Sequence, residues 1–277
     1  MSQNIGHSYS GGEQQRAADR FADIGGNAIV YTYPNGDVDI VCAAERIFRP
    51  SGWEAAEDFS RQGRNGPVPA KREREKKSQG DDMIRSMRRA RAKLRRLALS
   101  NEFEYFVTLT LDKEKIDRYD PKLIMQKVNR WLDNMVRRHG LRYILVPERH
   151  KDGAIHFHGF FAGSGLIAAD SGVQHEGRPV YNLPQWGFGF TTAQRLYGTY
   201  SAAVGYVCKY IGKQEGERPM GRWYYSGGAL QDAPKEYAIL DYRDLLEEFQ
   251  GEAVEFSIPG TKMVVIHHRE GGQHEGE

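Results

Sequence analysis

Two histidines separated by one residue stand in a segment whose composition is typical of a β-strand. Residues two apart in a strand point to the same face, so His156 and His158 lie about 7 Å apart at Cα and can converge on one ion. The chain has nine histidines, and a pair with this spacing arises easily by chance. Taken alone, the pair therefore favours two solvent-facing side chains.

A carboxylate provides a third donor and favours a metal site over two solvent-facing histidines. Glu148 ends the preceding predicted strand, and a tight turn through residues 151–153 would bring it beside the histidines. Two imidazoles and one carboxylate with open positions suit Mn²⁺ or Mg²⁺ acting on a phosphate, although the same set would accept Zn²⁺. The ion would polarise the phosphate and neutralise the charge that grows on it. His150 is a weaker alternative to Glu148 because it falls within the predicted turn.

A Tyr-x-x-Lys unit occurs twice in succession further along the chain. On a helix, Tyr206, Lys209, Tyr210 and Lys213 fall at i, i+3, i+4 and i+7, so all four share one face. A tyrosine that attacks phosphorus must lose a proton with an ordinary pKa of about 10, and cationic neighbours favour that loss. The alternative is an amphipathic helix whose tyrosines pack in a core while its lysines extend to solvent.

The surrounding sequence predicts the elements that position these groups. Pro121 suits the first turn of a helix and Gly140 its end. Strands are predicted at residues 104–111, 142–149, 154–161, 187–194 and 222–226, and helices at 122–139 and 202–213. This β-α-β-β-β-α-β order predicts an α+β fold, an antiparallel sheet with helices packed on one face.

Composition and charge divide the chain into four predicted parts. Residues 1–69 are expected to be an arm with a β-hairpin around Asn35-Gly36, residues 70–100 a basic helical segment, residues 101–227 the main domain and residues 228–277 an acidic tail. From Lys71 to Arg96 there are 12 basic and 4 acidic residues, whereas residues 230–277 carry 11 acidic and 4 basic ones. The basic segment is therefore the part expected to bind a polyanion.

Periodic apolar residues predict an amphipathic helix at residues 82–99. Its basic side chains are candidate phosphate contacts, with a solvated helix face as an equal alternative: Arg85, Arg88, Arg89, Arg91, Lys93, Arg95 and Arg96. Four aromatic residues are candidates for stacking on bases, although each is also a candidate core residue: Trp186, Phe188, Tyr224 and Tyr225.

The chain has no long apolar run and no secretion signal, and it contains only Cys42 and Cys208. These features predict a cytoplasmic protein that does not enter a membrane. A Gly-x-x-x-x-Gly-Lys-[Ser/Thr] nucleotide-binding loop is also missing from the sequence. Any unwinding of DNA would therefore fall to another protein.

Three blocks, Phe106 to Leu111, Glu148 with His156-Phe-His158, and the doubled tyrosine segment, resemble the HUH endonucleases that initiate rolling-circle replication. The resemblance is to the two-tyrosine type, and it implies a ferredoxin-like or RRM-like nuclease fold. It implies nicking and rejoining of single-stranded origin DNA through a 5′-phosphotyrosine, with a host helicase and polymerase as partners. Tyr206 and Tyr210 would be the nucleophiles, with Tyr206 slightly favoured. Lys209 and Lys213 would orient phosphates, and Thr108 would lie near the DNA.

Other readings of the sequence stay open. A conjugative relaxase is disfavoured because its tyrosine precedes the histidines, and a transposase with the same chemistry is the nearest rival. A zinc hydrolase built on His156 and His158 is a rival from another enzyme class, although it would need further ligands. In the third reading, the protein binds DNA through the basic helix and has no catalytic activity.

Overall fold

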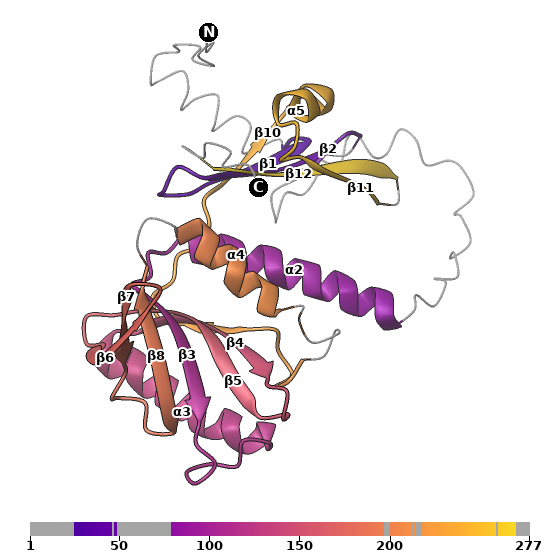
Figure 1. The fold of residues 1–277 in the computed structure, drawn as a ribbon. Coiled ribbons are helices and arrows are strands. Elements are labelled where there is room, and N and C mark those ends of the chain that lie inside the picture. The colour runs from indigo at the N-terminus through magenta and orange to yellow at the C-terminus, as the bar shows by residue number, and fades with distance from the viewer. Residues whose placement is uncertain are drawn as a thin grey trace. The chain divides into compact units, whose positions relative to one another are not determined.

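The computed structural model describes residues 25–45, 47–48, 79–196, 200–211, 213, 218–258 and 260–269. The chain forms two compact units (Figure 1). The central unit is Arg74–Asp232, and the terminal unit combines Met1–Glu73 with Ala233–Glu277. None of the described helices is both long enough and apolar enough to cross a membrane.

A seven-stranded antiparallel sheet with order β6-β7-β8-β3-β5-β4-β9 organises the central unit. The α+β class predicted from the sequence is confirmed, and β6 and β7 form a hairpin between residues 161 and 187, where no strand was predicted. The elements in chain order are α2 (Gln79–Leu99), β3 (Tyr105–Leu111), α3 (Pro121–His139), β4 (Arg142–Arg149), β5 (Ile155–Ala162), β6 (Ala169–His175), β7 (Arg178–Asn182), β8 (Gly189–Arg195), α4 (Tyr200–Tyr210) and β9 (Tyr225–Gly227).

Helix α3 begins and ends where the sequence predicts. The Asp120 carboxylate accepts hydrogen bonds from the amides of Lys122 and Leu123, and Pro121 occupies the first turn, where its missing N–H costs nothing. Gly140 closes the helix in the left-handed region with a φ of 60°, a conformation that glycine adopts without a steric penalty.

The helices cover both faces of the central sheet, whereas the sequence predicts them on one. Helix α3 packs on the face that carries Val107, Leu109 and Phe157, and this side forms the main hydrophobic core. Helix α4 covers part of the opposite face, where the Tyr210 ring stacks on His158 (Figure 1). Alternation along β5 turns each imidazole away from α3 while Phe157 points toward it, so the imidazoles lie on the face that α4 covers.

We expect Phe157→Ala to destabilise the protein by about 3–5 kcal/mol, because the substitution leaves a cavity in the core beneath the two histidines. Phe157 is 1% exposed and lies between them in the sequence. Urea denaturation measures the effect, and Phe190→Ala is the matched control since Phe190 is 69% exposed on β8. Equal losses for the two variants would contradict this placement of the core.

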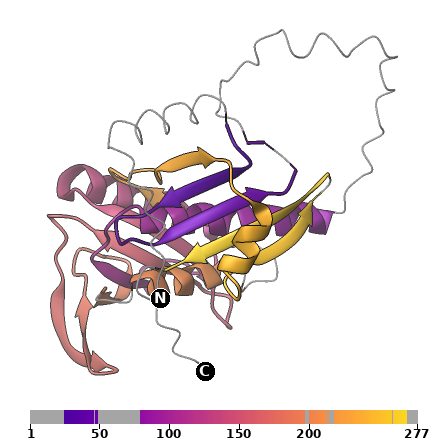
Figure 2. The same cartoon turned by 90° about the horizontal axis from the view of Figure 1, so that it is seen from above.

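The terminal unit is built from both ends of the sequence. Its strands and helix are β1 (Ala28–Thr32), β2 (Val38–Ala43), β10 (Lys235–Ala238), α5 (Tyr242–Glu248), β11 (Val254–Ile258) and β12 (Thr261–His268). They form an antiparallel sheet with order β10-β1-β2-β12-β11, in which the indigo β1 and β2 lie beside the yellow β12 and β11 (Figure 2). Leu245 of α5 packs against buried residues that include Ile40 and Val264.

The predicted hairpin at Asn35-Gly36 is present, with Gly36 at a φ of 83°. The segment expected to be an acidic tail contains β10, α5, β11 and β12, so it is folded rather than an appendage. Asn27 ties the two ends together, since its side-chain amide donates to the Leu240 carbonyl at 2.8 Å and accepts from the Leu240 amide at 2.9 Å. Net charge gave no indication of this pairing.

Candidate active site

The two histidines lie on neighbouring positions of one sheet face and are held from β3. Thr108 stands opposite His158 and Thr110 opposite His156 in the β3–β5 ladder. The hydroxyl of Thr108 is 3.1 Å from His158 Nδ1, and that of Thr110 is 3.3 Å from His156 Nδ1. Both contacts leave the Nε2 atoms directed away from β3. Burial lowers the pKa of both imidazoles, which favours the neutral form that binds metals.

Glu148 lies beside this pair, as the sequence predicts. It stands opposite His156 in the β4–β5 ladder, and its Oε2 is 2.8 Å from His158 Nε2. Its other oxygen, Oε1, is 2.8 Å from Lys213 Nζ. His150, the weaker alternative, lies in the β4–β5 turn and pairs with Asp152 at 3.5 Å. Glu148 is therefore the carboxylate that joins the histidine face.

The donor chemistry of these three residues fits a divalent cation, but the side chains as placed do not enclose one. Within the described ranges, no group of three or more His, Cys, Asp or Glu residues is arranged as a set of metal ligands. The Glu148 carboxylate is instead divided between His158 and Lys213. An ion held here would take the place of those two contacts, with the threonine hydroxyls orienting the imidazoles from behind.

Helix α4 places both tyrosines over the same face. The Tyr210 ring stacks on the His158 ring with centroids 4.1 Å apart and an interplanar angle of 9°. Its hydroxyl donates to the Tyr206 hydroxyl at 2.7 Å. Tyr206 is 49% exposed and packs edge-on against Phe106, whereas Tyr210 is 8% exposed. Tyr206 is therefore the more accessible phenol. Burial, followed by the hydrogen bond to Tyr206, raises the pKa of Tyr210, so this phenol is also the harder one to ionise in its present setting.

The two lysines have different positions. Helix α4 ends at Tyr210, so Lys213 does not occupy the helical i+7 position that the sequence predicts. It nevertheless reaches the site, because its ammonium lies 5.1 Å from the Tyr210 ring centroid and contacts Glu148. That hydrogen bond to Glu148 raises the pKa of Lys213. Lys209 is exposed on α4, and none of the described residues forms an ion pair with it.

Helix α2 is present, but only part of its basic face is available to a ligand. Three of the predicted phosphate contacts are exposed: Arg88, Arg89 and Lys93. Arg85 pairs with Asp82 at 3.1 Å, and Arg91, Arg95 and Arg96 are half-buried. The C-terminal half of α2 contacts the tyrosine helix, where the Tyr200 hydroxyl donates to the Ala98 carbonyl at 2.7 Å. This part of α2 therefore supports α4.

The four aromatic residues proposed for base stacking pack mainly inside the central unit. Trp186 is a core residue, and Phe188 and Tyr225 pack against the same core. Burial raises the pKa of Tyr224. Sequence reasoning missed Thr110, Phe106 and Phe190, which the sheet places on the histidine face. The alternation in Phe-Val-Thr-Leu-Thr-Leu was a signal for Phe106 and Thr110, since every second residue of a strand lies on the same face of the sheet as Thr108.

We expect Thr108→Val to weaken Mn²⁺ binding by about tenfold or more, because it removes the group that orients His158 while keeping the shape of the side chain. Isothermal titration calorimetry with Mn²⁺ and no DNA measures the affinity. Thr192→Val is the matched control, since Thr192 is exposed opposite Thr108 on β8. An unchanged affinity in Thr108→Val would show that this hydroxyl does not position a ligand.

The sequence profile of a family described as replication-associated protein, of the ORF2 and gene II protein type, matches residues 104–215. The match supports a replication-initiator family. The matched segment includes β3, both histidines, Glu148, both tyrosines and Lys213, although it spans less than half of the chain. No curated protein matches this chain significantly, and no solved structure does either.

Proposed function

We propose that this protein initiates rolling-circle replication by nicking and rejoining single-stranded origin DNA through a 5′-phosphotyrosine. The observation that carries the proposal is the meeting of α4 with β5, where the Tyr210 ring stacks on His158 and the Tyr210 hydroxyl contacts that of Tyr206. A phosphate bound at the histidine face beside this stacked pair would lie next to both phenols. The similarity to replication-associated proteins supports DNA as the substrate.

The proposed cleavage is a phosphoryl transfer that needs no nucleotide cofactor. The Tyr206 oxygen forms a bond to the scissile phosphorus, and the bond from phosphorus to the 3′ oxygen breaks. The phenol gives its proton to solvent, and the departing 3′ oxygen takes one up. The phosphodiester is conserved as a phosphotyrosine, so attack by a 3′ hydroxyl can reverse the step and rejoin the strand.

In this proposal His156, His158 and Glu148 hold Mn²⁺ or Mg²⁺. The ion would polarise the scissile phosphate and offset the charge that develops on it. Lys213 balances the Glu148 carboxylate in the present arrangement and would be released toward the DNA when an ion takes that carboxylate. Lys209 is exposed on the same helix as Tyr206 and would contact the DNA backbone.

The exposed basic residues of α2 would add phosphate contacts outside the cleavage site. Arg88, Arg89 and Lys93 are the residues available for this role. Contacts of this kind weaken steeply as salt concentration rises. A host helicase and polymerase would supply unwinding and synthesis, since the sequence has no nucleotide-binding loop of the Walker type.

Incubation with Mn²⁺ and labelled single-stranded origin DNA tests the proposal. We expect a labelled protein band that protease removes, and we expect it to be absent from the Tyr206→Phe, Tyr210→Phe double variant. DNA affinity measured without metal should be unchanged in that variant. A non-catalytic DNA-binding protein would give the same affinity but no adduct in the wild type, and a transposase would cleave transposon ends in preference to a replication origin.

A further inference from the structure

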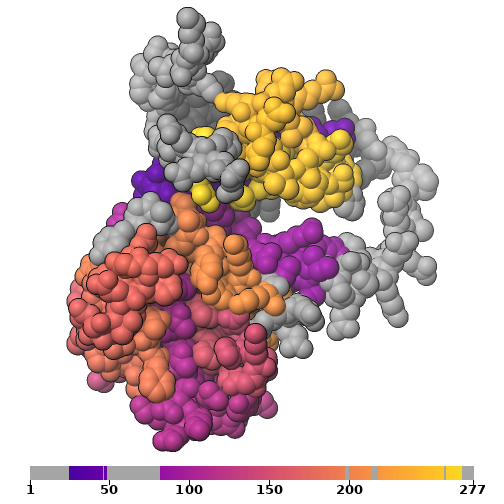
Figure 3. Space-filling model, viewed as in Figure 1, coloured from indigo at the N-terminus to yellow at the C-terminus, as the bar shows by residue number. Residues whose placement is uncertain are grey.

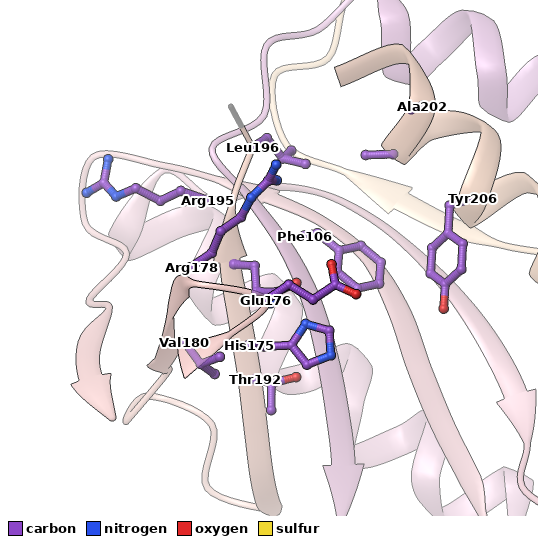
Figure 4. A pocket seen from close by; sticks show the side chains of 12 residues that line it. Phe106, His175, Glu176, Arg178, Val180, Thr192, Arg195, Leu196, Ala202 and Tyr206 are labelled. Carbon is purple, nitrogen blue, oxygen red and sulfur yellow. The ribbon is translucent and has the colours of Figure 1, made fainter. Parts of the chain in front are cut away.

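A cavity of about 590 Å³ opens beside Tyr206, and neither His156 nor His158 lines it (Figure 4). Its floor is the sheet face at Phe106 and Thr192, and α4 contributes Tyr206 and Ala202. The third side is the turn between β6 and β7. The β6–β7 hairpin and α4 are both visible at the surface in the space-filling view of Figure 3. A cavity of this size lies in the range that holds small organic groups.

The β6–β7 turn presents its side chains to this cavity from a constrained backbone. Glu176 and Gly177 have φ values of 51° and 72°, the pair of positive angles that a type I′ turn requires. His175 and Arg178 flank the turn as a paired position of the ladder. Glycine and asparagine are the usual residues in the left-handed region, so a glutamate there is uncommon. The turn therefore fixes where the Glu176 side chain leaves the backbone at the edge of the cavity.

The cavity combines three kinds of chemical group: aromatic rings, a carboxylate and a guanidinium. The Phe106 and Tyr206 rings give aromatic surface, and Figure 4 shows the Glu176 carboxylate directed toward Phe106. Among the described residues, none forms a hydrogen bond or ion pair with that carboxylate. Arg178 adds a guanidinium at the same opening. A site for phosphate alone would not use a carboxylate, whereas a nucleotide offers a flat ring, N–H donors and a phosphate together.

We propose that this cavity is a base-reading subsite that takes one unpaired nucleotide next to the scissile phosphate. The base lies against Phe106 and Tyr206, the Glu176 carboxylate accepts hydrogen bonds from the base edge, and Arg178 contacts the adjoining phosphate. Guanine is the favoured base, because its N1–H and exocyclic amino group are neighbouring donors that match the two oxygens of a carboxylate. The inference rests on the proposed function in taking single-stranded DNA as the ligand.

The test is a binding selection without divalent metal, so that its result does not depend on cleavage. Wild-type protein and Glu176→Gln are each equilibrated with a pool of short single-stranded DNA of random sequence, and the bound fraction is sequenced. We expect a guanine preference at one position in the wild type and a loss of that preference by about tenfold in the variant. Glu247→Gln makes the same charge change at an exposed position of α5 and should behave as the wild type.

Affinity for the unselected pool should stay within about twofold in Glu176→Gln, whereas Arg178→Ala should weaken binding to all sequences and reduce its salt dependence. Equal base preferences in wild type and Glu176→Gln would overturn the subsite, as would a wild type that selects no base. The nickase proposal is judged separately by the covalent adduct. If the protein selects guanine but forms no adduct, the base-reading subsite is supported and the nickase proposal is rejected.

Discussion

Tyr206→Phe is expected to slow formation of the covalent DNA adduct by at least about a thousandfold, whereas Tyr210→Phe should retain the first cleavage. The physical reason is the difference between the two phenols. Tyr206 is 49% exposed, while Tyr210 is 8% exposed and its pKa is raised by burial and by the hydrogen bond to Tyr206. The buried phenol is therefore harder to ionise and harder for a phosphate to reach.

Single-turnover reactions with labelled single-stranded DNA and Mn²⁺ measure both rates. Tyr200→Phe is a matched control, because Tyr200 lies on the same helix but donates to backbone carbonyls of Ala98 and Asn101. If the two tyrosines act in turn, Tyr210→Phe will still make the first cut but will not carry out the second strand transfer. The assay would then show the covalent adduct without release of a joined DNA product. A Tyr206→Phe variant that cleaves at the wild-type rate would make Tyr210 the first nucleophile and contradict the assignment.

Glu148→Gln is expected to reduce the rate of adduct formation on the order of a thousandfold, since it removes the charge that we propose holds the metal over the scissile phosphate. The same substitution should weaken Mn²⁺ binding measured by calorimetry without DNA. Glu148 lies where His158 and Lys213 converge, with its side chain only 13% exposed. Raising the Mn²⁺ concentration should restore part of the rate.

Glu114→Gln provides the comparison, because Glu114 is an exposed carboxylate of the central unit that makes no contact with the histidine face. Affinity for single-stranded DNA without metal should be similar in both variants and the wild type. Wild-type Mn²⁺ affinity in Glu148→Gln would place the metal elsewhere or remove it from the reaction. A lost adduct with unchanged Mn²⁺ affinity would instead assign Glu148 to the orientation of Lys213.

Much of the central unit could be predicted from local patterns. The bounds of β4 were predicted to the residue, and the two ends of α3 were predicted from Pro121 and Gly140. These features depend on neighbours in the sequence, which is why residue type and spacing are informative. The approach of Glu148 to the histidines was also predictable, because a short turn fixes the register between two strands.

Features set by long-range packing were not predictable in the same way. The coverage of both sheet faces depends on where α4 returns after β8, and nothing in the helical pattern of residues 202–213 gives that direction. Lys213 reaches Glu148 from beyond the end of α4, so its place is decided by the turn that follows Tyr210. The basic pattern of α2 likewise did not distinguish Arg88, which is exposed, from Arg91, which is half-buried.

The terminal unit shows the same limit on a larger scale. The alternation in β1 and β2 predicted a hairpin, but its partners β10 and β12 come from the far end of the chain. Strand pairing across such a separation depends on complementary faces rather than on local signals. The acidic residues of this region therefore suggested a tail, while Val264 and Ile266 of β12 are buried in the core of the unit.

Mass spectrometry of the trapped DNA adduct tests the central claim most directly. Trypsin cuts after Lys209 and so separates the two candidate nucleophiles, leaving Tyr206 in the peptide of residues 196–209 and Tyr210 in the peptide of residues 210–213. We expect the nucleotide on the first peptide, at Tyr206, and only when Mn²⁺ or Mg²⁺ is present. A nucleotide on a residue outside α4, or the absence of any nucleotide-bearing peptide, would contradict cleavage by tyrosines facing the histidine pair.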